Sequence, residues 1–145
     1  MVKIISNIVF LGALLLGESL KVGDTFPQTS FKNQFEQKVS VSKNIKQFIV
    51  VFSKDDSEKV KIFLEKNPNY LQSNDTLYGT DLSEAPSLVV SMFMKPKFKK
   101  YPYSMILLEE KQQAKLFPKS ENKITILTLE NLQIKKIEYK SNLER

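Results

Sequence analysis

The feature that most constrains the fold of this sequence is a continuous apolar run, Phe48-Ile49-Val50-Val51-Phe52, followed at once by a polar stretch rich in helix-starting residues. β-Branched and aromatic residues favour strands, and a strand that is apolar on both faces must be buried on both. Such a strand leading directly into a helix is typical of an α/β fold. At 145 residues the chain is long enough for one domain and too short for two of ordinary size.

Capping and proline signals predict two helices. The first is predicted to begin at Asp55, with Glu58 completing a capping box, and to end before Pro68. The second is predicted to be capped by Ser83 and to end at Pro96. Its buried face would consist of four apolar residues at helical spacing, Leu88, Val89, Met92 and Phe93.

Further short apolar or alternating segments predict the remaining strands. They lie at residues 38–41, 76–81, 105–108 and 114–117, and a hairpin of residues 124–129 and 134–139 closes the chain. In this hairpin Ile134, Ile137 and Tyr139 are expected to be partly buried.

The first nineteen residues have the composition of an export signal. Lys3 gives a positive start, residues 4–16 are mostly apolar, and Gly17 and Ser19 place small residues where a signal peptidase cleaves. The apolar run is shorter than the roughly 18 residues of a membrane-spanning helix. We therefore predict a signal peptide at 1–19, a single domain at 20–145, and a periplasmic or otherwise exported protein. The alternative is a short uncleaved anchor in the inner membrane, the one case in which membrane contact is expected.

The composition excludes several classes of chemistry. The chain contains neither cysteine nor histidine, so it supplies no thiolate for disulfide exchange and no histidine for a catalytic triad. The net charge is +6, and every cation except Arg145 is a lysine. Because arginine is the usual reader of bases and phosphates, nucleic acid is not expected as a partner. No cofactor and no metal are expected either.

The order of the predicted elements and three local features resemble the thioredoxin-like fold family. Lys21-Val22-Gly23-Asp24-Thr25-Phe26-Pro27 is similar to the opening of many exported thioredoxin-like proteins and peroxiredoxins. The strand at 48–52 enters a helix cap where that family carries its Cys-x-x-Cys motif. Tyr101-Pro102 lies 46 residues beyond Asp56, close to the family's spacing between its first cysteine and its cis-proline. Over residues 22–117 the resemblance implies a three-layer α/β sandwich with a central mixed sheet, and the C-terminal hairpin would be an addition to it.

The stretch that matches the redox motif, Ser53-Lys54-Asp55-Asp56-Ser57-Glu58, contains no sulfur. The resemblance therefore implies the family's shape without its redox activity. In relatives of this fold, the loop before the first helix and the cis-proline loop form a shallow face that receives an extended peptide. We predict a non-catalytic module that binds a protein or peptide, and the lysines suit an acidic one. The expected binding residues are Lys54, Asp55, Lys95, Lys97, Phe98, Lys99, Lys100, Tyr101, Pro102 and Tyr103.

Other interpretations of the same residues stay open. The lysine-rich segment 93–103 is also explained by a solvated helix end from which Phe93 and one tyrosine pack inward. Asp55 and Asp56 are explained by helix capping, or by a weak metal site or a non-thiol enzyme. A third alternative is a membrane-tethered accessory subunit of an envelope complex.

Overall fold

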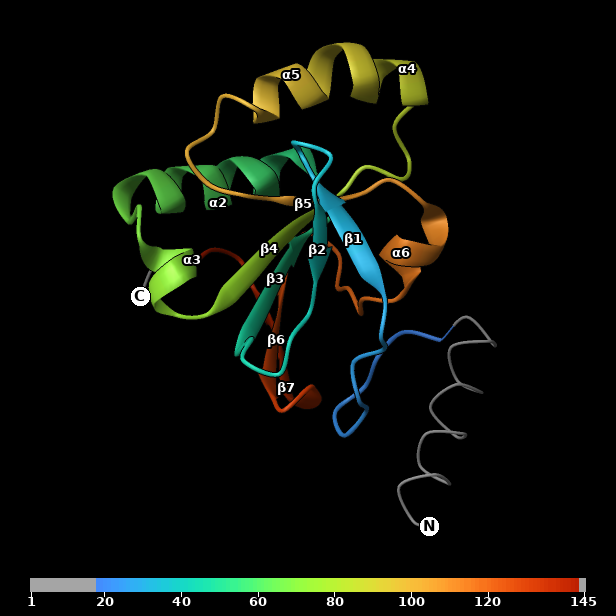
Figure 1. Ribbon diagram of the computed structural model, residues 1–145, viewed down its shortest axis with the longest axis vertical. Coiled ribbons are helices and arrows are strands. Elements are labelled where there is room, and N and C mark those ends of the chain that lie inside the picture. Colours follow the sequence, from blue (N-terminus) through green and yellow to red (C-terminus); the bar gives the residue numbers. More distant parts are fainter. Residues whose placement is uncertain (1–17, 144–145) are drawn as a thin grey trace.

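The computed structural model describes residues 18–143, which form a mixed sheet of seven strands in the order β2-β1-β5-β4-β3-β6-β7 (Figure 1). The three central strands are parallel, and the outer strands run antiparallel to their neighbours. The strands are β1 (Ser30–Asn33), β2 (Lys38–Ser40), β3 (Gln47–Val51), β4 (Thr76–Asp81), β5 (Ile106–Leu108), β6 (Ile124–Glu130) and β7 (Gln133–Lys140). The predicted α/β class is confirmed.

The side chains of β3 alternate between two hydrophobic cores, one on each face of the sheet. Phe48 and Val50 belong to the first core, and Ile49 and Val51 belong to the second. All four side chains are buried. This confirms the prediction of a central strand covered on both faces, which is why its sequence shows no polar alternation.

Helices cover the two faces unequally. The helical elements are α2 (Lys54–Lys66), α3 (Tyr70–Ser73), α4 (Ser87–Val89), the π-helical turn η1 (Val90–Met94), α5 (Lys95–Phe98) and α6 (Lys111–Lys115). Val60 of α2 and Val90 of η1 pack into the second core, whereas α6 leads into Leu116 and Phe117 of the first. Figure 1 shows α2 close to the segment from α4 to α5, with α6 apart from both beside β1.

The first core is centred on four phenylalanine rings. Phe26, Phe31, Phe48 and Phe117 lie with ring centroids between 4.8 and 6.3 Å apart. Gly79 of β4 passes directly beside this cluster, and a Cβ placed on it would lie 3.3 Å from Cε1 of Phe48. A glycine in the middle of this strand therefore reflects a close approach, as strand glycines often do.

The first helix starts earlier than predicted. Ser53, not Asp55, is the N-cap: its φ of −139° is extended, and its Oγ accepts a hydrogen bond from the backbone N–H of Asp56 at 3.1 Å. Asp55 lies within the first turn, so the predicted capping box of Asp55 and Glu58 is wrong.

The second helix differs at both ends. Ser83 does not cap it, because the Ser83 hydroxyl donates to Oδ1 of Asp81 at 2.6 Å and the helix begins only at Ser87. Pro96 does not end it, because the chain stays helical to Phe98. The π-helical turn η1 ends at Met94, two residues before this proline, and it includes Met92, whose carbonyl a proline ring at position 96 would meet in a regular α-helix.

The predicted buried face of this helix is in fact exposed. Leu88, Val89, Met92 and Phe93 have exposed fractions of 68%, 39%, 58% and 67%. The residues that pack inward are Val90 and Phe98. The segment has apolar residues on both of its sides, so the pattern alone did not determine which side would face the core.

Two further predictions concern the C-terminal half. Residues 114–117 are not a returning strand, since α6 occupies Lys111–Lys115 and begins with a capping box of Glu110 and Gln113. The hairpin of β6 and β7 is confirmed, although Tyr139 is exposed. It is not an appendage, because β6 pairs directly with β3 in the central sheet.

Most of the predicted signal peptide lies outside the described residues, which include only Glu18 and Ser19 of it. Within residues 18–143, no helix has the length and apolar character needed to cross a bilayer.

Candidate functional site

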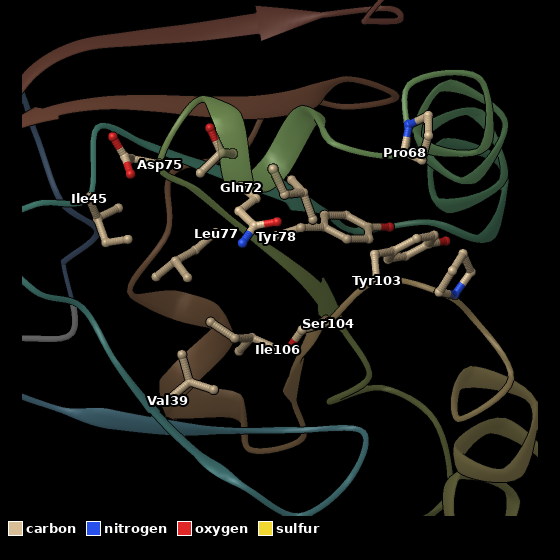
Figure 2. Close-up of a pocket in the computed structure, with 13 residues that line it drawn as sticks. Val39, Ile45, Pro68, Gln72, Asp75, Leu77, Tyr78, Tyr103, Ser104 and Ile106 are labelled. Atoms are coloured by element: carbon tan, nitrogen blue, oxygen red, sulfur yellow. The ribbon is translucent and has the colours of Figure 1, made fainter.

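A groove of about 410 Å³ opens between the first half of β4 and the hairpin of β1 and β2 (Figure 2). We call it the β4 groove. Val39 and Ile45 line it on the hairpin side, and Leu77 and Tyr78 of β4 line the opposite side. Pro102, Tyr103 and Ser104 border it before the chain enters β5, and Pro68, Leu71, Gln72, Asp75, Thr76 and Ile106 complete the lining.

The groove exists because β5 is shorter than β4. The two strands pair only at Gly79–Ile106, Thr80–Leu107 and Asp81–Leu108. The first three residues of β4 therefore extend beyond β5, with no strand of residues 18–143 paired to them on that side. A strand edge without a neighbour presents backbone groups to whatever lies next to it.

An aromatic wall closes one end of the groove. The rings of Tyr78 and Tyr103 lie side by side, with centroids 6.1 Å apart (Figure 2). The ring centroid of Tyr101 lies 5.4 Å from that of Tyr103. Burial raises the pKa of both Tyr78 and Tyr103 above the ordinary value of a phenol. Both side chains therefore stay neutral further into the alkaline range than an exposed tyrosine does. The Tyr78 side chain is 2% exposed, and its hydroxyl lies 3.5 Å from Oγ of Ser57.

The loop that carries Pro102 is held by one buried side chain, Gln34. Its Nε2 donates to the backbone oxygens of Phe98 at 3.2 Å and Tyr103 at 2.8 Å, and its Oε1 accepts from the N–H of Met105 at 2.9 Å. Gln34 lies in the turn between β1 and β2, so the hairpin fixes both ends of the loop. Sequence reasoning missed this residue, because a lone glutamine carries no pattern.

Among the predicted binding residues, Pro102 and Tyr103 line the β4 groove. Tyr101 is partly buried, and the Lys61 ammonium lies 5.6 Å from its ring centroid. The cis-proline that the family resemblance implied is absent: no peptide bond within residues 18–143 is cis, so the bond before Pro102 is trans.

Two members of the predicted lysine-aromatic segment are engaged inside the structure. Phe98 is 6% exposed and belongs to the second core. Lys95 pairs with Glu36 at 3.4 Å and with Glu109 at 3.3 Å. Burial alone would lower the pKa of Lys95, but its hydrogen bonds and ion pairs with Glu109 and Glu36 outweigh burial and raise that pKa. Neither residue is placed to anchor a partner.

The remaining lysines of the segment, Lys97, Lys99 and Lys100, are exposed at the end of α5. Their positions leave them available to steer a charged partner.

The residues at the start of α2 do not line the β4 groove. Lys54 and Asp55 are exposed, whereas Asp56 is buried with Nζ of Lys59 3.6 Å from its Oδ1. The carboxylates of Asp55 and Asp56 thus lie in different environments and do not form a pair. Residues 18–143 contain no group of three or more acidic, cysteine or histidine side chains able to hold a metal ion.

No family model matches the sequence, and no curated protein matches it. Solved structures do match. A putative thiol:disulfide interchange protein DsbE from Chlorobium tepidum aligns with a TM-score of 0.57 at 13% identity over 82% of this chain and 85% of that one. Peroxidoxin BcpB from Mycobacterium tuberculosis gives 0.55 at 11% identity, over 83% and 86%.

A third match is the thioredoxin domain of a thiol-disulfide oxidoreductase from Bacteroides vulgatus. It aligns with a TM-score of 0.54 at 15% identity, over 83% of this chain and 89% of that one. At sequence identities this low, the matches show a similarity of fold and nothing about activity. Together with the mixed sheet and the two helical layers described above, they show that this cysteine-free chain has a thioredoxin-like fold.

Proposed function

We propose that this chain is an exported, non-catalytic thioredoxin-like domain that binds an extended segment of a protein partner in the β4 groove. The observation that carries the proposal is the free first half of β4, which lies beside Pro102, Tyr103 and Ser104 in an open groove.

The groove has what recognition of an extended segment requires. Added strands bind a free sheet edge through main-chain hydrogen bonds, and neighbouring pockets select alternate side chains. Val39, Ile45 and Leu77 offer apolar contacts to such a segment, and Tyr103 and Ser104 offer hydroxyl groups. A mostly apolar site with a few polar groups is typical of specific binding.

The absence of cysteine from the sequence supports a non-catalytic role. Two of the structural neighbours are named as a thiol-disulfide oxidoreductase and a thiol:disulfide interchange protein, and disulfide exchange requires a thiolate. In this chain the corner between β3 and α2 holds Ser53, Lys54 and Asp55 instead. Hydroxyl, amine and carboxylate groups can form hydrogen bonds and ion pairs with a partner there, but they cannot exchange disulfides.

The charge of the chain favours an acidic partner. The net charge is +6, and Lys97, Lys99 and Lys100 are exposed close in sequence to the groove residues Pro102 and Tyr103. Charged side chains outside the contact area of a binding site mainly accelerate association and make it dependent on salt. Association with the partner should therefore slow as ionic strength rises.

Export rests on the signal-like residues 1–19. A rival proposal keeps this segment as an anchor, so that the domain serves as an accessory subunit at the membrane. Mass spectrometry of the protein from its native source separates the two: a mature N-terminus at or near Leu20 supports export with cleavage, and retention of Met1 supports the tether.

Peptide selection tests the groove itself. Peptides chosen from a random displayed library should bind the wild-type protein, and Gln72→Trp should weaken their binding at least about tenfold by filling the groove from its exposed rim. Gln112→Trp, an equally bulky change at an exposed position of α6, is the matched control. Equal binding by the wild type and the Gln72 variant would refute the assignment to the groove, as would failure to select any peptide.

A further inference from the structure

The exposed side of the segment from α4 to η1 is an apolar surface that the proposed function does not use. It consists of Leu88, Val89, Met92 and Phe93, and three of these side chains are more than half exposed. None of them lines the β4 groove. Single exposed apolar residues are ordinary, but a contiguous group on one helix marks an interaction surface. We call it the α4 face.

Lysines follow the α4 face directly along the same helical segment. Lys97, Lys99 and Lys100 are exposed and make no ion pair with another described residue. Residues 84–103 contain four lysines and a single acidic residue, Glu84. The fourth lysine, Lys95, pairs with both Glu36 and Glu109, so it offsets part of their negative charge and is not itself available to an anionic partner.

We propose that the α4 face docks onto the surface of an anionic phospholipid bilayer. Leucine, methionine and phenylalanine side chains on one helix, bordered by lysines, have the chemistry of helices that lie in a membrane interface. The apolar side chains would enter the boundary between headgroups and acyl chains. The long lysine side chains would extend to the lipid phosphates while their alkyl chains remain in apolar surroundings.

Charge argues against a second copy of this chain as the occupant. A symmetric dimer through the α4 face would bring the same patch of both protomers together, and with it their unpaired lysines. An anionic surface instead complements both the lysines and the net charge of +6. The segment lies along the surface and does not cross the bilayer, in agreement with the lack of a spanning helix among residues 18–143.

The absence of tryptophan makes the proposal directly measurable. Phe93→Trp places a single tryptophan on the α4 face, and its emission can be excited apart from that of the five tyrosines. On addition of vesicles of phosphatidylcholine and phosphatidylglycerol its emission should shift to shorter wavelength, and vesicles of phosphatidylcholine alone should cause little shift. Raising the salt concentration from about 0.1 to about 1 M should reverse the shift, because the Debye length falls from about 10 to about 3 Å. Tyr139→Trp on β7, partly exposed and remote in the sheet, is the control that should not respond.

Two sets of substitutions in the Phe93→Trp background separate the contributions. Replacing Lys97, Lys99 and Lys100 by Gln should weaken binding to anionic vesicles by about fivefold per lysine, on the order of 100-fold together. Leu88→Ser with Met92→Ser should weaken it by at least about tenfold. All five positions are exposed, so circular dichroism and thermal unfolding of the variants should match the parent.

Several outcomes would overturn the proposal. One is an emission shift with polyglutamate but not with anionic vesicles, which would assign the surface to an acidic protein. Another is a concentration-dependent dimer in sedimentation that the Ser variants abolish, which would assign it to a second copy. A third is an unchanged spectrum with every vesicle. Gln72→Trp tests a different site, so its peptide binding can fail while vesicle binding by the α4 face persists.

Discussion

At the start of α2, three neighbouring side chains have different roles, although the sequence predicts Asp55 as the helix cap. The Ser53 hydroxyl caps the helix, the Asp56 carboxylate is buried beside Lys59, and Asp55 is exposed in the first turn. Sequence alone could place the helix start within two residues, because serine and aspartate are both good caps. It could not choose between them, since the choice depends on where β3 leaves the sheet.

This division predicts unequal effects on stability. Ser53→Ala should lower the free energy of unfolding by about 1 kcal/mol, the usual cost of losing an N-cap. Asp55→Asn should lower it by only a few tenths of a kcal/mol, since it removes just an exposed charge near the helix N-terminus. Urea unfolding of both variants measures the difference. A larger loss for Asp55→Asn would show that Asp55 is the cap after all.

Tyr78 predicts how stability responds to alkaline pH. Burial raises its pKa in the folded state above the value near 10 of an unfolded tyrosine. Above pH of about 10 the unfolded chain therefore releases a proton that the folded protein keeps, so the free energy of unfolding falls as pH rises. In Tyr78→Phe this fall should be shallower by up to about 1.4 kcal/mol per pH unit.

The Tyr78→Phe comparison is made by urea unfolding at a series of pH values from about 8 to about 11. Lysines titrate in the same range, but they are common to both proteins and cancel in the difference. Parallel stability curves for the two proteins would mean that the Tyr78 phenol ionises equally in the folded and unfolded states.

At the scale of elements, the central strands were more predictable than the helices, whereas β1 was not predicted and residues 114–117 were wrongly predicted as a strand. A strand such as β3 or β4 is marked by its β-branched and aromatic residues whatever lies around it. The segment from α4 to α5 has apolar residues on two sides, and only its contact with the sheet decides that Val90 and Phe98 turn inward. The α6 helix had a usable signal, the capping pair of Glu110 and Gln113, which the apolar run after it obscured.

Because Gly79 in β4 lies against Phe48 in β3, adding a single methyl group at position 79 should lower the stability of the fold. Gly79→Ala would place a carbon 3.3 Å from the Phe48 ring, which the three other rings of the first core prevent from moving. We expect a loss of about 1–3 kcal/mol, as for other overpacked cores. Thermal unfolding measures it, and Gly79→Ala combined with Phe48→Leu should recover part of the loss. An unchanged stability of the Gly79→Ala variant would mean that the phenylalanine rings of the first core move aside without loss of stability.

At the scale of the whole molecule, the seven strands form one continuous sheet, and the segment before β1 is hydrogen-bonded to its edge strand β7. Gly23 donates to the Ile134 oxygen, and the Ile134 N–H donates to the Asp24 oxygen, both at 2.8 Å. The β4 groove forms only when the whole chain is folded, because four separate parts of the chain line it, represented by Val39, Leu71, Leu77 and Tyr103. Local sequence patterns identified Pro102 and Tyr103 but could not reveal their neighbours.

Because the sheet is continuous, we expect the domain to unfold as a single cooperative unit. Amides of β6 should exchange hydrogen only through global unfolding, with the same free energy as those of β3. Ile134→Ala, at a fully buried position of β7, should lower protection in both strands equally, by about 2–5 kcal/mol. Tyr139→Ala on the exposed side of β7 is the control and should change little. Earlier exchange of the hairpin than of β3 would show that it is an independent appendage.

The three hydrogen bonds of Gln34 have a consequence for how this protein can evolve. Its amide is needed as donor and acceptor at once. A glutamate would set a carboxylate against two carbonyl oxygens, and a leucine would remove the side-chain partner of the Met105 N–H and of the Tyr103 oxygen. The Phe98 oxygen would keep its second donor, the N–H of Tyr101. The exposed lysines of the loop bear no such constraint. Among descendants of this sequence, the loop should diverge quickly in its charges, while position 34 keeps its amide or changes only together with the residues that it fastens.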